Sequence, residues 1–352
     1  MTVAVNTTAV EAATRLLIVI VNYRTGRLAV DCLASIADER AADPLGCARV
    51  RAVVVDNASG DGSSEIIAAA IASSGWAAWA SVIDAPSNGG FASGNNFAIR
   101  PALASAEPPE LFWLLNPDTR MRPGAVAATT RFFKATPTAG IAGTMIESAN
   151  GALWPFAFRF PSILSEFERG IRLSLVTRLL DAHRILRRMG DVPAVVDWVS
   201  GASMVVRREV FDAVGLLDEG YFLYFEETDF CRAARRAGWS CWYVPDACVM
   251  HLAGQSTGVT NNSRRRLPRY WFASRRRYFT GDRGRGYAVA VDLAWLLAHL
   301  MWTGRRLVSL RPNDNPDHLL RDFLAGSAVW RRDDRSDQRS PEPVVQALAT
   351  AE

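Results

Sequence analysis

Short apolar runs of strand length alternate with helical patterns between residues 16 and 115. The run 16–21 is continuous and apolar, which is typical of a strand that is covered on both faces. Apolar residues at helical spacing follow it over 28–36, and further strand runs appear at 50–55, 82–83 and 111–115. This alternation predicts a doubly wound, mostly parallel α/β sheet with helices on its faces.

Polar side chains directly follow three of these predicted strands. They are Asn22 and Tyr23 after the first strand, Asp56 and Asn57 after the second, and Asn116 and Asp118 after the fourth. Doubly wound sheets bind ligands at the carboxyl ends of their strands, so one crevice is expected to collect these residues. Taken singly, Asp56 and Asp118 could instead only form Asx turns. Together at one edge of the sheet they favour a binding site.

The segment 87–96, between the third and fourth strands, contains three glycines. Glycine lets the backbone approach a ligand closely, and a helix beginning near Asn95 would offer free N–H groups to a phosphate. The spacing differs from the dinucleotide-binding pattern GxGxxG and from the Walker loop. The segment therefore indicates either a ligand-binding loop or a tight turn.

Composition and charge describe a globular chain. Of 352 residues, 49% are apolar and 22% charged, which is enough apolar material for a large core. The net charge of +4 is too small to indicate nucleic-acid binding, although bunched arginines favour local anionic partners. The five cysteines show no CxxC spacing, so neither a disulfide framework nor a zinc site is predicted, and a reducing cytosol fits best.

The ends of the chain differ from its middle. No secretory signal is visible, so residues 1–14 are expected to form a flexible leader and 331–352 a disordered tail. The apolar run 287–302 is interrupted by Asp292 and His299 and is followed by Arg305 and Arg306. It is too short and too interrupted to span a bilayer. It could lie in the membrane interface with the arginines toward anionic lipid, or pack as a C-terminal helix.

Three acids, Glu226, Glu227 and Asp229, lie in an apolar and aromatic neighbourhood. Because clustered acids repel one another, their placement beside side chains expected to be buried indicates a site that uses them. If a helix begins near Glu226, a rotation of about 100° per residue places Asp229 near Glu226 and nearly opposite Glu227. Asp229 is then expected to pair with Arg232 or Arg236. Alternatively, the acids only decorate a helix N-terminus.

Five segments together resemble the family 2 glycosyltransferases of the GT-A fold, in particular the rhamnosyltransferases of bacterial surface-polysaccharide synthesis. They are 18–24, 53–61, 88–96, 113–118 and 197–258, and the resemblance covers roughly residues 15 to 280. It implies a Rossmann-like sheet with a nucleotide-sugar-binding half over 15–145 and an acceptor-binding, catalytic half over 146–280. A helical, membrane-associated extension is expected over 281–330.

The resemblance also implies a role for each candidate residue. The donor nucleotide would be bound by Asn22, Tyr23, Asp56, Asn57, Asn88, Gly89, Asn95 and Asn116, with Asp56 on the pyrimidine base. Asp118 and His251 would bind Mg²⁺ or Mn²⁺, although Asn116 replaces the first Asp of the DxD-like element. Trp198, Ser200, Gly201 and Arg264 would lie beside the donor sugar, diphosphate or acceptor. A core role for Trp198, a structural role for His251 and a solvated basic face at 264–266 are the alternatives.

Glu227 would be the general base and Glu226 its supporting neighbour. The implied reaction is metal-dependent and inverting, and it moves a sugar from a nucleotide donor, foremost L-rhamnose from dTDP-rhamnose. The acceptor would be a lipid-linked glycan or polysaccharide of the cell surface, such as cell wall or lipopolysaccharide O-antigen. A cytoplasmic enzyme peripheral to the inner face of the membrane is expected. A UDP-hexose transferase of the same fold and a non-catalytic glycan-binding relative remain open.

Overall fold

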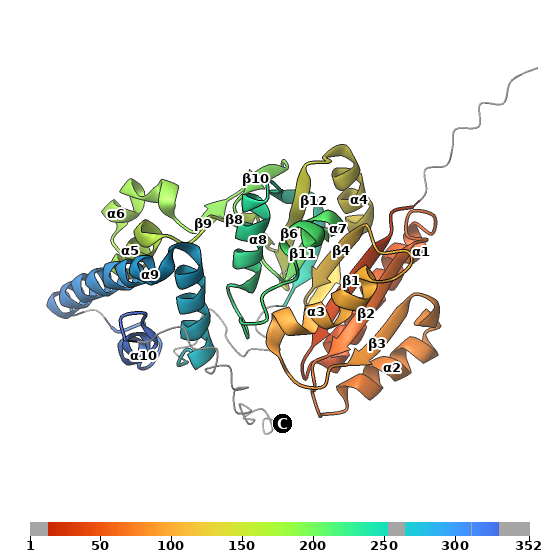
Figure 1. Ribbon diagram of the computed structural model, residues 1–352, viewed down its shortest axis with the longest axis horizontal. Helices are drawn as coiled ribbons and strands as arrows, with labels where there is room; N and C mark the ends of the chain where they lie inside the picture. The colour runs from red at the N-terminus through yellow and green to blue at the C-terminus, as the bar shows by residue number, and fades with distance from the viewer. Residues whose placement is uncertain (1–12, 253–264, 311, 331–352) are drawn as a thin grey trace, which may run out of the picture.

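The computed structural model describes residues 13–252, 265–310 and 312–330. Figure 1 shows a curled sheet flanked by helices, with a group of helices (α5, α6, α9 and α10) at one end of the molecule. Most of the predicted leader, the predicted tail, the loop 254–258 and Arg264 lie outside the described residues.

Four parallel strands form one half of the sheet, as the apolar runs predict. They are β1 (Leu16–Asn22), β2 (Val50–Asp56), β3 (Ala80–Asp84) and β4 (Leu111–Leu115). Strand β1 pairs with both β2 and β4, and β2 pairs with β3. Asn22 lies opposite Asp56, and Asp56 opposite Asp84, so these strands end level with one another. The polar residues that follow them therefore come to one edge.

The other half of the sheet is mixed in direction. It contains β6 (Ala139–Ser148), β10 (Ala194–Val196), β11 (Ser203–Arg207) and β12 (Ser240–His251), and the short strands β5 (Thr119–Met121) and β7 (Leu153–Trp154) pair with β12 and β6. Strand β11 is antiparallel to β4, with Ser203 opposite Leu115. The residues that precede β11 therefore lie at the edge where β4 ends.

Helices cover both faces of the sheet, which explains why its strands are apolar on both sides. Side chains of α1 (Gly26–Ala42), α2 (Ser63–Ser73) and α4 (Ala125–Ala135) share one core cluster with Leu16, Ile18 and Ile20. Side chains of α3 (Gly90–Leu103), α7 (Arg208–Val214) and α8 (Glu226–Arg236) share a second cluster with Leu17 and Val19. Alternate residues of β1 thus point into opposite cores.

The helices at the end of the molecule pack around α9 (Arg269–Val308), which bends at Arg283 and Gly284. Helix α5 (Ile163–Ile171) crosses it so closely that a Cβ atom at residue 170 would lie 2.9 Å from the Cβ atom of Ala298. Short helices α6 (Ser174–Leu179) and α10 (Leu319–Gly326) and the hairpin β8 (Phe156–Phe158) with β9 (Leu186–Arg188) complete this region. The apolar run 287–302 is shorter than a membrane span, but α9, which contains it, is long and apolar enough to cross a membrane by length and composition.

Candidate active site

Asp56 ends β2 in a dense set of hydrogen bonds. The side-chain amide of Asn22 donates to its Oδ1 atom at 2.7 Å, and the Ser59 hydroxyl donates to the same oxygen at 2.6 Å. The backbone N–H of Ser59 donates to Oδ2 at 2.9 Å. Asp56 thus bonds to the backbone of its own loop, as the Asx-turn alternative anticipated, but three residues on and not two. Ser59, which sequence reasoning did not single out, thus joins the ends of β1 and β2.

Asn57 links the end of β2 to the glycine-containing segment. Its side-chain amide donates to Oδ1 of Asn88 at 2.9 Å and to the carbonyl of Gly90 at 3.1 Å. Its own Oδ1 atom is buried and has no hydrogen-bond partner among the described residues. Tyr23, half-buried on the other side of this edge, lies under the guanidinium of Arg24, 5.1 Å from the ring centre. A buried acceptor without a partner usually indicates a ligand or water.

The helix that follows the glycines begins at Gly90, so the predicted start near Asn95 is wrong. Oδ1 of Asn88 accepts the N–H of Gly90 at 3.1 Å, which stabilises the earlier start. Gly89 is the residue directly before the helix, and Asn95 lies within it, where its side chain donates to the carbonyl of Phe91. The Oδ1 atom of Asn95 is buried without a partner among the described residues.

Gly90 makes a close approach to the backbone, but the neighbour is another segment of this protein. Its φ is +83°, and a Cβ atom there would lie 1.7 Å from the carbonyl oxygen of Phe222. The N–H of Phe91 donates to that same carbonyl at 3.0 Å. The glycine-containing segment therefore supports the chain that leads directly to Glu226 and Glu227. Sequence spacing could not reveal this contact, because it joins residues far apart in the chain.

Two strained residues precede the acids. Tyr224 and Phe225 have φ values of +71° and +72°, a left-handed conformation that costs about 1–3 kcal/mol for a residue other than glycine. Helix α9 supports them: the hydroxyl of Ser274 donates to the carbonyl of Leu223 at 3.0 Å, and the Tyr278 ring lies 5.4 Å from that of Phe225. Strain of this kind persists where surrounding contacts hold it, which is common at functional sites.

Glu226 and Glu227 begin α8, as predicted; Glu226 is buried and Glu227 half-buried, and the Oε2 atom of each is shielded from solvent. The Oε2 atom of each has no hydrogen-bond partner among the described residues. Burial raises the pKa of Glu226 well above its ordinary value, and the neighbouring Glu227 raises it further. Burial also raises the pKa of Glu227. Hydrogen bonds from backbone N–H groups, including that of Gly201, lower this pKa and so offset part of the increase. The fold thus keeps two adjacent carboxyls short of partners and resistant to ionisation.

Asp229 plays a different part. It forms an ion pair with Arg232 and accepts a hydrogen bond from the Tyr221 hydroxyl at 3.2 Å. Arg236 pairs with Asp282 at 2.7 Å instead. The predicted pairing of Asp229 within the helix is therefore confirmed, with Arg232 as the partner. These contacts occupy the Asp229 carboxylate, which sets it apart from the two glutamates.

Asp118 and His251 are close in space although they are far apart in the chain: Asp118 directly precedes β5, and His251 ends β12. The Oδ1 atom of Asp118 is 3.2 Å from Nε2 of His251, and the Asn116 side-chain nitrogen is 3.4 Å from the same ring nitrogen. Pairing of β5 with β12 places Thr119 opposite His251 and so fixes this proximity. Within the described residues, no group of three or more His, Cys, Asp or Glu side chains is arranged so that it could hold a metal ion by itself. Two protein ligands fit a divalent cation whose other ligands are phosphate oxygens and water.

The segment before β11 connects the surroundings of Asp118 and His251 with those of Glu226 and Glu227. The N–H of Asn116 donates to the carbonyl of Ala202 at 3.0 Å, and the hydroxyl of Ser200 accepts the N–H of Ala202 at 3.2 Å. A Cβ atom at residue 201 would lie 3.0 Å from the ring of Phe91. The backbone N–H of Gly201 interacts with the Glu227 carboxyl, and the next residue, Ala202, is bonded to Asn116. Gly201 therefore lies between Glu227 and Asn116. The structure brings these predicted residues to one place.

Trp198 and Arg266, of the basic segment 264–266, make contacts with other parts of the protein and not with the residues above. The Trp198 indole stacks on Phe158 with 4.2 Å between ring centres, and its N–H donates to the carbonyl of Arg159. One face of the indole is therefore covered by protein, in line with the core alternative. Arg266 makes a two-point ion pair with Asp322 at 2.6 Å, so its guanidinium is bound to α10.

Comparison with known proteins gives a consistent result. Residues 13–269 match the family described as glycosyltransferase like family 2. The chain is 32% identical over 206 residues to an N-acetylglucosaminyl-diphospho-decaprenol L-rhamnosyltransferase of Mycobacterium tuberculosis, covering 56% of this chain and 62% of that protein. It is 26% identical over 166 residues to the rhamnosyltransferase WbbL of Escherichia coli, covering 47% and 61%. The matches thus span less than two thirds of these relatives.

Solved structures show the same fold. A mannosyltransferase, PcManGT from Pyrobaculum calidifontis in complex with GDP-Man and Mn²⁺, superposes with a TM-score of 0.53 at 14% identity, covering 91% of this chain and 82% of that one. GalNAc-T7 with UDP, GalNAc and Mn²⁺ also gives 0.53 at 14% identity, covering 91% and 56%. The predicted fold class, a mostly parallel α/β sheet of the GT-A kind with a C-terminal helical extension, is confirmed.

Proposed function

We propose, on the premise that this chain belongs to glycosyltransferase family 2 and is a glycosyltransferase, that it transfers L-rhamnose from dTDP-rhamnose to a lipid-linked glycan. The observation that carries the proposal is the pair of buried carboxyls at Glu226 and Glu227, each with an unpartnered oxygen, at the sheet edge that also holds Asp118 and His251. Rhamnose is favoured because both curated relatives described above are named rhamnosyltransferases.

Glu227 is the base in this proposal. A carboxyl whose pKa is raised is a stronger proton acceptor once ionised, and it titrates closer to the working pH. The acceptor hydroxyl gives its proton to Glu227 while its oxygen attacks the anomeric carbon. The bond to the nucleotide diphosphate breaks on the opposite side, so the anomeric configuration inverts. Glu226, whose pKa is raised by burial and by Glu227, keeps its proton and adds no second negative charge.

Asp118 and His251 would hold a divalent cation, Mg²⁺ or Mn²⁺. The Oδ1 atom of Asp118 and the Nε2 atom of His251 face each other at 3.2 Å, and both solved neighbours are complexes with Mn²⁺ and a nucleotide or nucleotide sugar. When bound, such a cation neutralises charge that develops on the leaving diphosphate. The amide nitrogen of Asn116 lies 3.4 Å from the same Nε2 atom of His251, so a bound cation would replace this contact.

The donor nucleotide would lie along the ends of β1 and β2 and the start of α3. Oδ2 of Asp56 accepts only one hydrogen bond among the described residues, so it retains capacity for the N3–H of a thymine or uracil. The buried Oδ1 atoms of Asn57 and Asn95 offer two more acceptors for donor hydroxyl or N–H groups. The acceptor is proposed to be lipid-linked because the mycobacterial relative is named for a diphospho-decaprenol substrate. The proposal includes the cytoplasmic location predicted from the sequence.

The test is a donor screen in the presence of Mg²⁺ or Mn²⁺, read by thermal shift and by donor hydrolysis. We expect dTDP-rhamnose to raise Tm and to be hydrolysed, and UDP-glucose to do neither. Chelation of the cation should remove both effects. Stabilisation by UDP-glucose alone would overturn the rhamnose assignment, and it would favour the UDP-hexose alternative while sparing the family. No response to any nucleotide sugar would support the glycan-binding alternative.

A further inference from the structure

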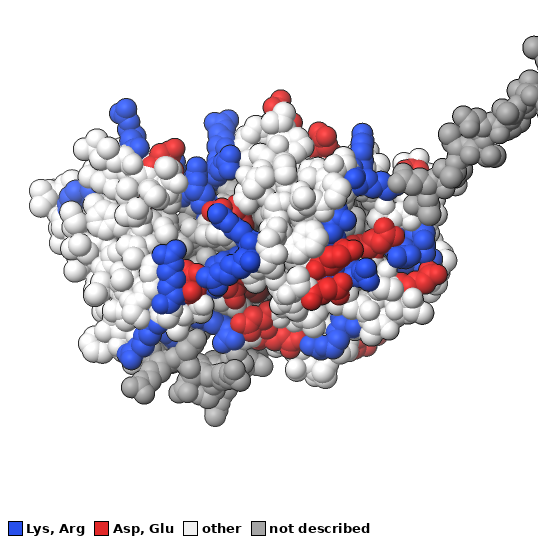
Figure 2. All heavy atoms as spheres, turned by 45° about the horizontal axis from the view of Figure 1, so that its top comes forward, with Lys and Arg blue, Asp and Glu red and all other residues white. Residues whose placement is uncertain are grey.

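The second part of α9 carries apolar side chains on its outward side. The side chain of Leu297 is 56% exposed and that of Val308 is 88% exposed. Four further apolar side chains on this part of the helix are about half exposed. We call this set the outer stripe: Leu293, Leu297, Leu300, Met301, Leu307 and Val308. Spacings of three and four residues place its members on one side of a helix. Figure 2 shows this end of the molecule largely free of charged side chains.

The opposite side of the same helix is buried. Val291, Asp292, Trp295, Ala298 and His299 all face the protein. At about 100° per residue this buried set and the outer stripe point in opposite directions. A helix on the surface of a soluble protein normally carries polar residues outward, so an apolar outward side indicates a partner. Between residues 286 and 308 the only acid is Asp292, which lies on the inner side.

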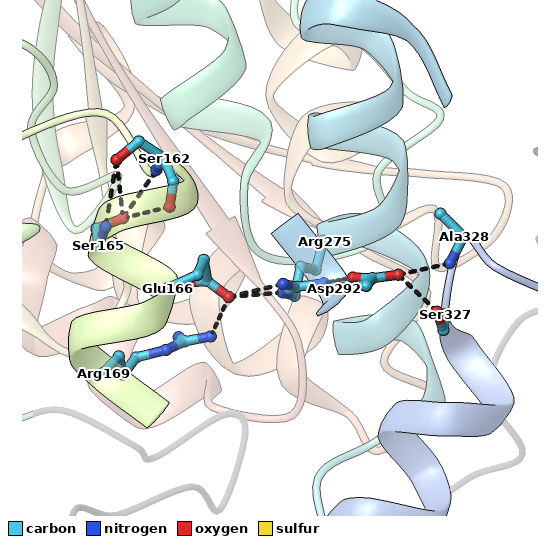
Figure 3. A network of polar contacts seen from close by, with 8 residues as sticks. All are labelled: Ser162, Ser165, Glu166, Arg169, Arg275, Asp292, Ser327 and Ala328. Atoms are coloured by element: carbon cyan, nitrogen blue, oxygen red, sulfur yellow. Dashed lines mark hydrogen bonds and ion pairs between the residues drawn. The ribbon is translucent and has the colours of Figure 1, made fainter. Parts of the chain in front are cut away.

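A buried network holds the inner side of α9 to the protein (Figure 3). Arg275, on the first part of α9, pairs with Glu166 of α5 at 2.7 Å and with Asp292 on the second part. Asp292 also accepts the Ser327 hydroxyl at 2.6 Å and the Ala328 N–H at 2.7 Å. If α9 crossed a membrane, Asp292 would enter hydrocarbon and Arg275 would lose a partner, which is costly. The helix can therefore lie along a membrane but not cross it.

The charges around the outer stripe indicate what covers it. Arg283 and Arg285 are exposed and lie before it, and Arg305, which donates to the carbonyls of Ile171 and Arg172, lies near its C-terminal end. Trp330, 72% exposed, follows Val329, whose carbonyl accepts a hydrogen bond from Arg285. Exposed arginines at the start of an apolar helix side, with an exposed tryptophan next to the residue that Arg285 contacts, suit anionic lipid headgroups. A second copy packed on the stripe would bring these positive ends together, which is unfavourable.

We propose that the outer stripe docks on the surface of an anionic lipid bilayer, with the second part of α9 lying in the plane of the interface. The bent helix and the network around Arg275 hold the stripe outward, so docking needs no rearrangement of the fold. The proposal concerns the partner of this surface and does not depend on which sugar is transferred.

The test is sedimentation of the full chain with vesicles of phosphatidylcholine, with and without phosphatidylglycerol. We expect binding to the anionic vesicles that weakens with salt. Replacing Leu297→Glu and Leu300→Glu together should lower the partition coefficient by about tenfold or more per leucine. Leu45→Glu, at a position 82% exposed on the far side of the sheet domain, is the matched control and should bind like the parent. Leu297→Ser with Leu300→Ser is a milder second variant, and thermal unfolding verifies that each variant folds.

Several results would overturn the proposal. One is the absence of binding to anionic vesicles, and another is equal binding by the parent and the Leu297/Leu300 variants. A dimer in solution that these variants dissociate would show that the stripe is covered by a second copy. Retention of the chain in cell membranes after an alkaline carbonate wash would show a spanning helix. Donor hydrolysis in solution is a separate measurement: its failure in the parent would contradict the proposed function and leave the docking result standing.

Discussion

Among single residues, Glu227 carries the proposed chemistry. Glu227→Gln keeps the shape of the side chain and removes the proton acceptor, so we expect kcat to fall by about 10²–10⁴-fold. Donor binding, measured by thermal shift, should be unchanged because the residues proposed to bind the nucleotide do not include Glu227. Asp229→Asn is the matched control: its carboxylate is bound by Arg232 and Tyr221, so its effect should appear in Tm more than in kcat.

The pH dependence of kcat/KM tests whether Glu227 is the proton acceptor. Burial raises the pKa of Glu227, so kcat/KM of the parent should fall as pH is lowered through that raised pKa, because a protonated carboxyl cannot accept a proton. The residual activity of Glu227→Gln should lack this acidic limb. Full turnover in this variant, or an unchanged limb, would assign the base to another group.

Glu226 should cost stability at neutral pH. In the unfolded chain its carboxyl ionises near its ordinary value of 4.5, whereas in the folded chain burial and Glu227 raise its pKa. The folded state therefore holds a proton that the unfolded state has lost, and stability falls as pH rises above that value. Glu226→Gln should raise Tm at neutral pH, with little difference at pH values below 4.5. A lower Tm at neutral pH would show that the ionised form is stabilised.

Among the elements, the start of α3 sets the position of the start of α8. Gly90→Ala would place a Cβ atom 1.7 Å from the Phe222 carbonyl at a φ of +83°, and we expect a loss of about 3 kcal/mol or more, with reduced activity. Gly124→Ala is the control, since its φ is +84° but no atom lies within 4 Å of the added Cβ. It should cost only about 1 kcal/mol. Equal losses of unfolding free energy would show that the contact with Phe222 is unimportant.

The bend of α9 depends on a buried cation. Burial alone would raise the pKa of Glu166, but Arg169 and Arg275 together hold it below its ordinary value. Arg275→Met leaves the buried Asp292 without its cation and Glu166 with only Arg169, so urea unfolding should show a loss of about 3–5 kcal/mol. Adding Glu166→Gln and Asp292→Asn to this variant should recover most of the loss. If it recovers none, packing of the arginine stem, and not charge, is what stabilises the bend. The ion pair of Arg266 with Asp322 at the protein surface serves as the comparison. Because surface ion pairs contribute little to stability, Arg266→Gln should change Tm little.

The elements that sequence predicted best are those with one clear physical cause. Strands β1 and β4 were readable because both of their faces are buried and their residues are almost all apolar, whereas β2 carries the exposed Arg51 and the edge strand β3 is mostly half-buried or exposed. The start of α3 was misplaced because the side chain of Asn88 accepts the N–H of Gly90, so the helix begins five residues before Asn95. The left-handed conformations of Tyr224 and Phe225 have no signature in sequence, since contacts with α9 produce them.

In the whole molecule, the candidate site depends on long-range pairing that spacing does not show. Alternation of strands and helices predicted that Asn22, Asp56 and Asn116 share one edge, and the register confirms it for Asn22 and Asp56. The meeting of Asp118 with His251 followed only from family resemblance, because it results from the pairing of β5 with β12. The contact of Gly201 with Phe91 and Glu227 was likewise unreadable, since it needs the antiparallel placement of β11.

The placement of β11 between β4 and β6 also has a consequence for biosynthesis. As the chain leaves the ribosome, β4 is complete at residue 115, but the strand that covers its open edge ends at residue 207. At about 5–20 residues per second, a nascent chain would expose that apolar edge for roughly 5–20 seconds. Such an edge can pair with another polypeptide. Chaperones that hold emerging chains would therefore be expected to matter most for this protein during that interval.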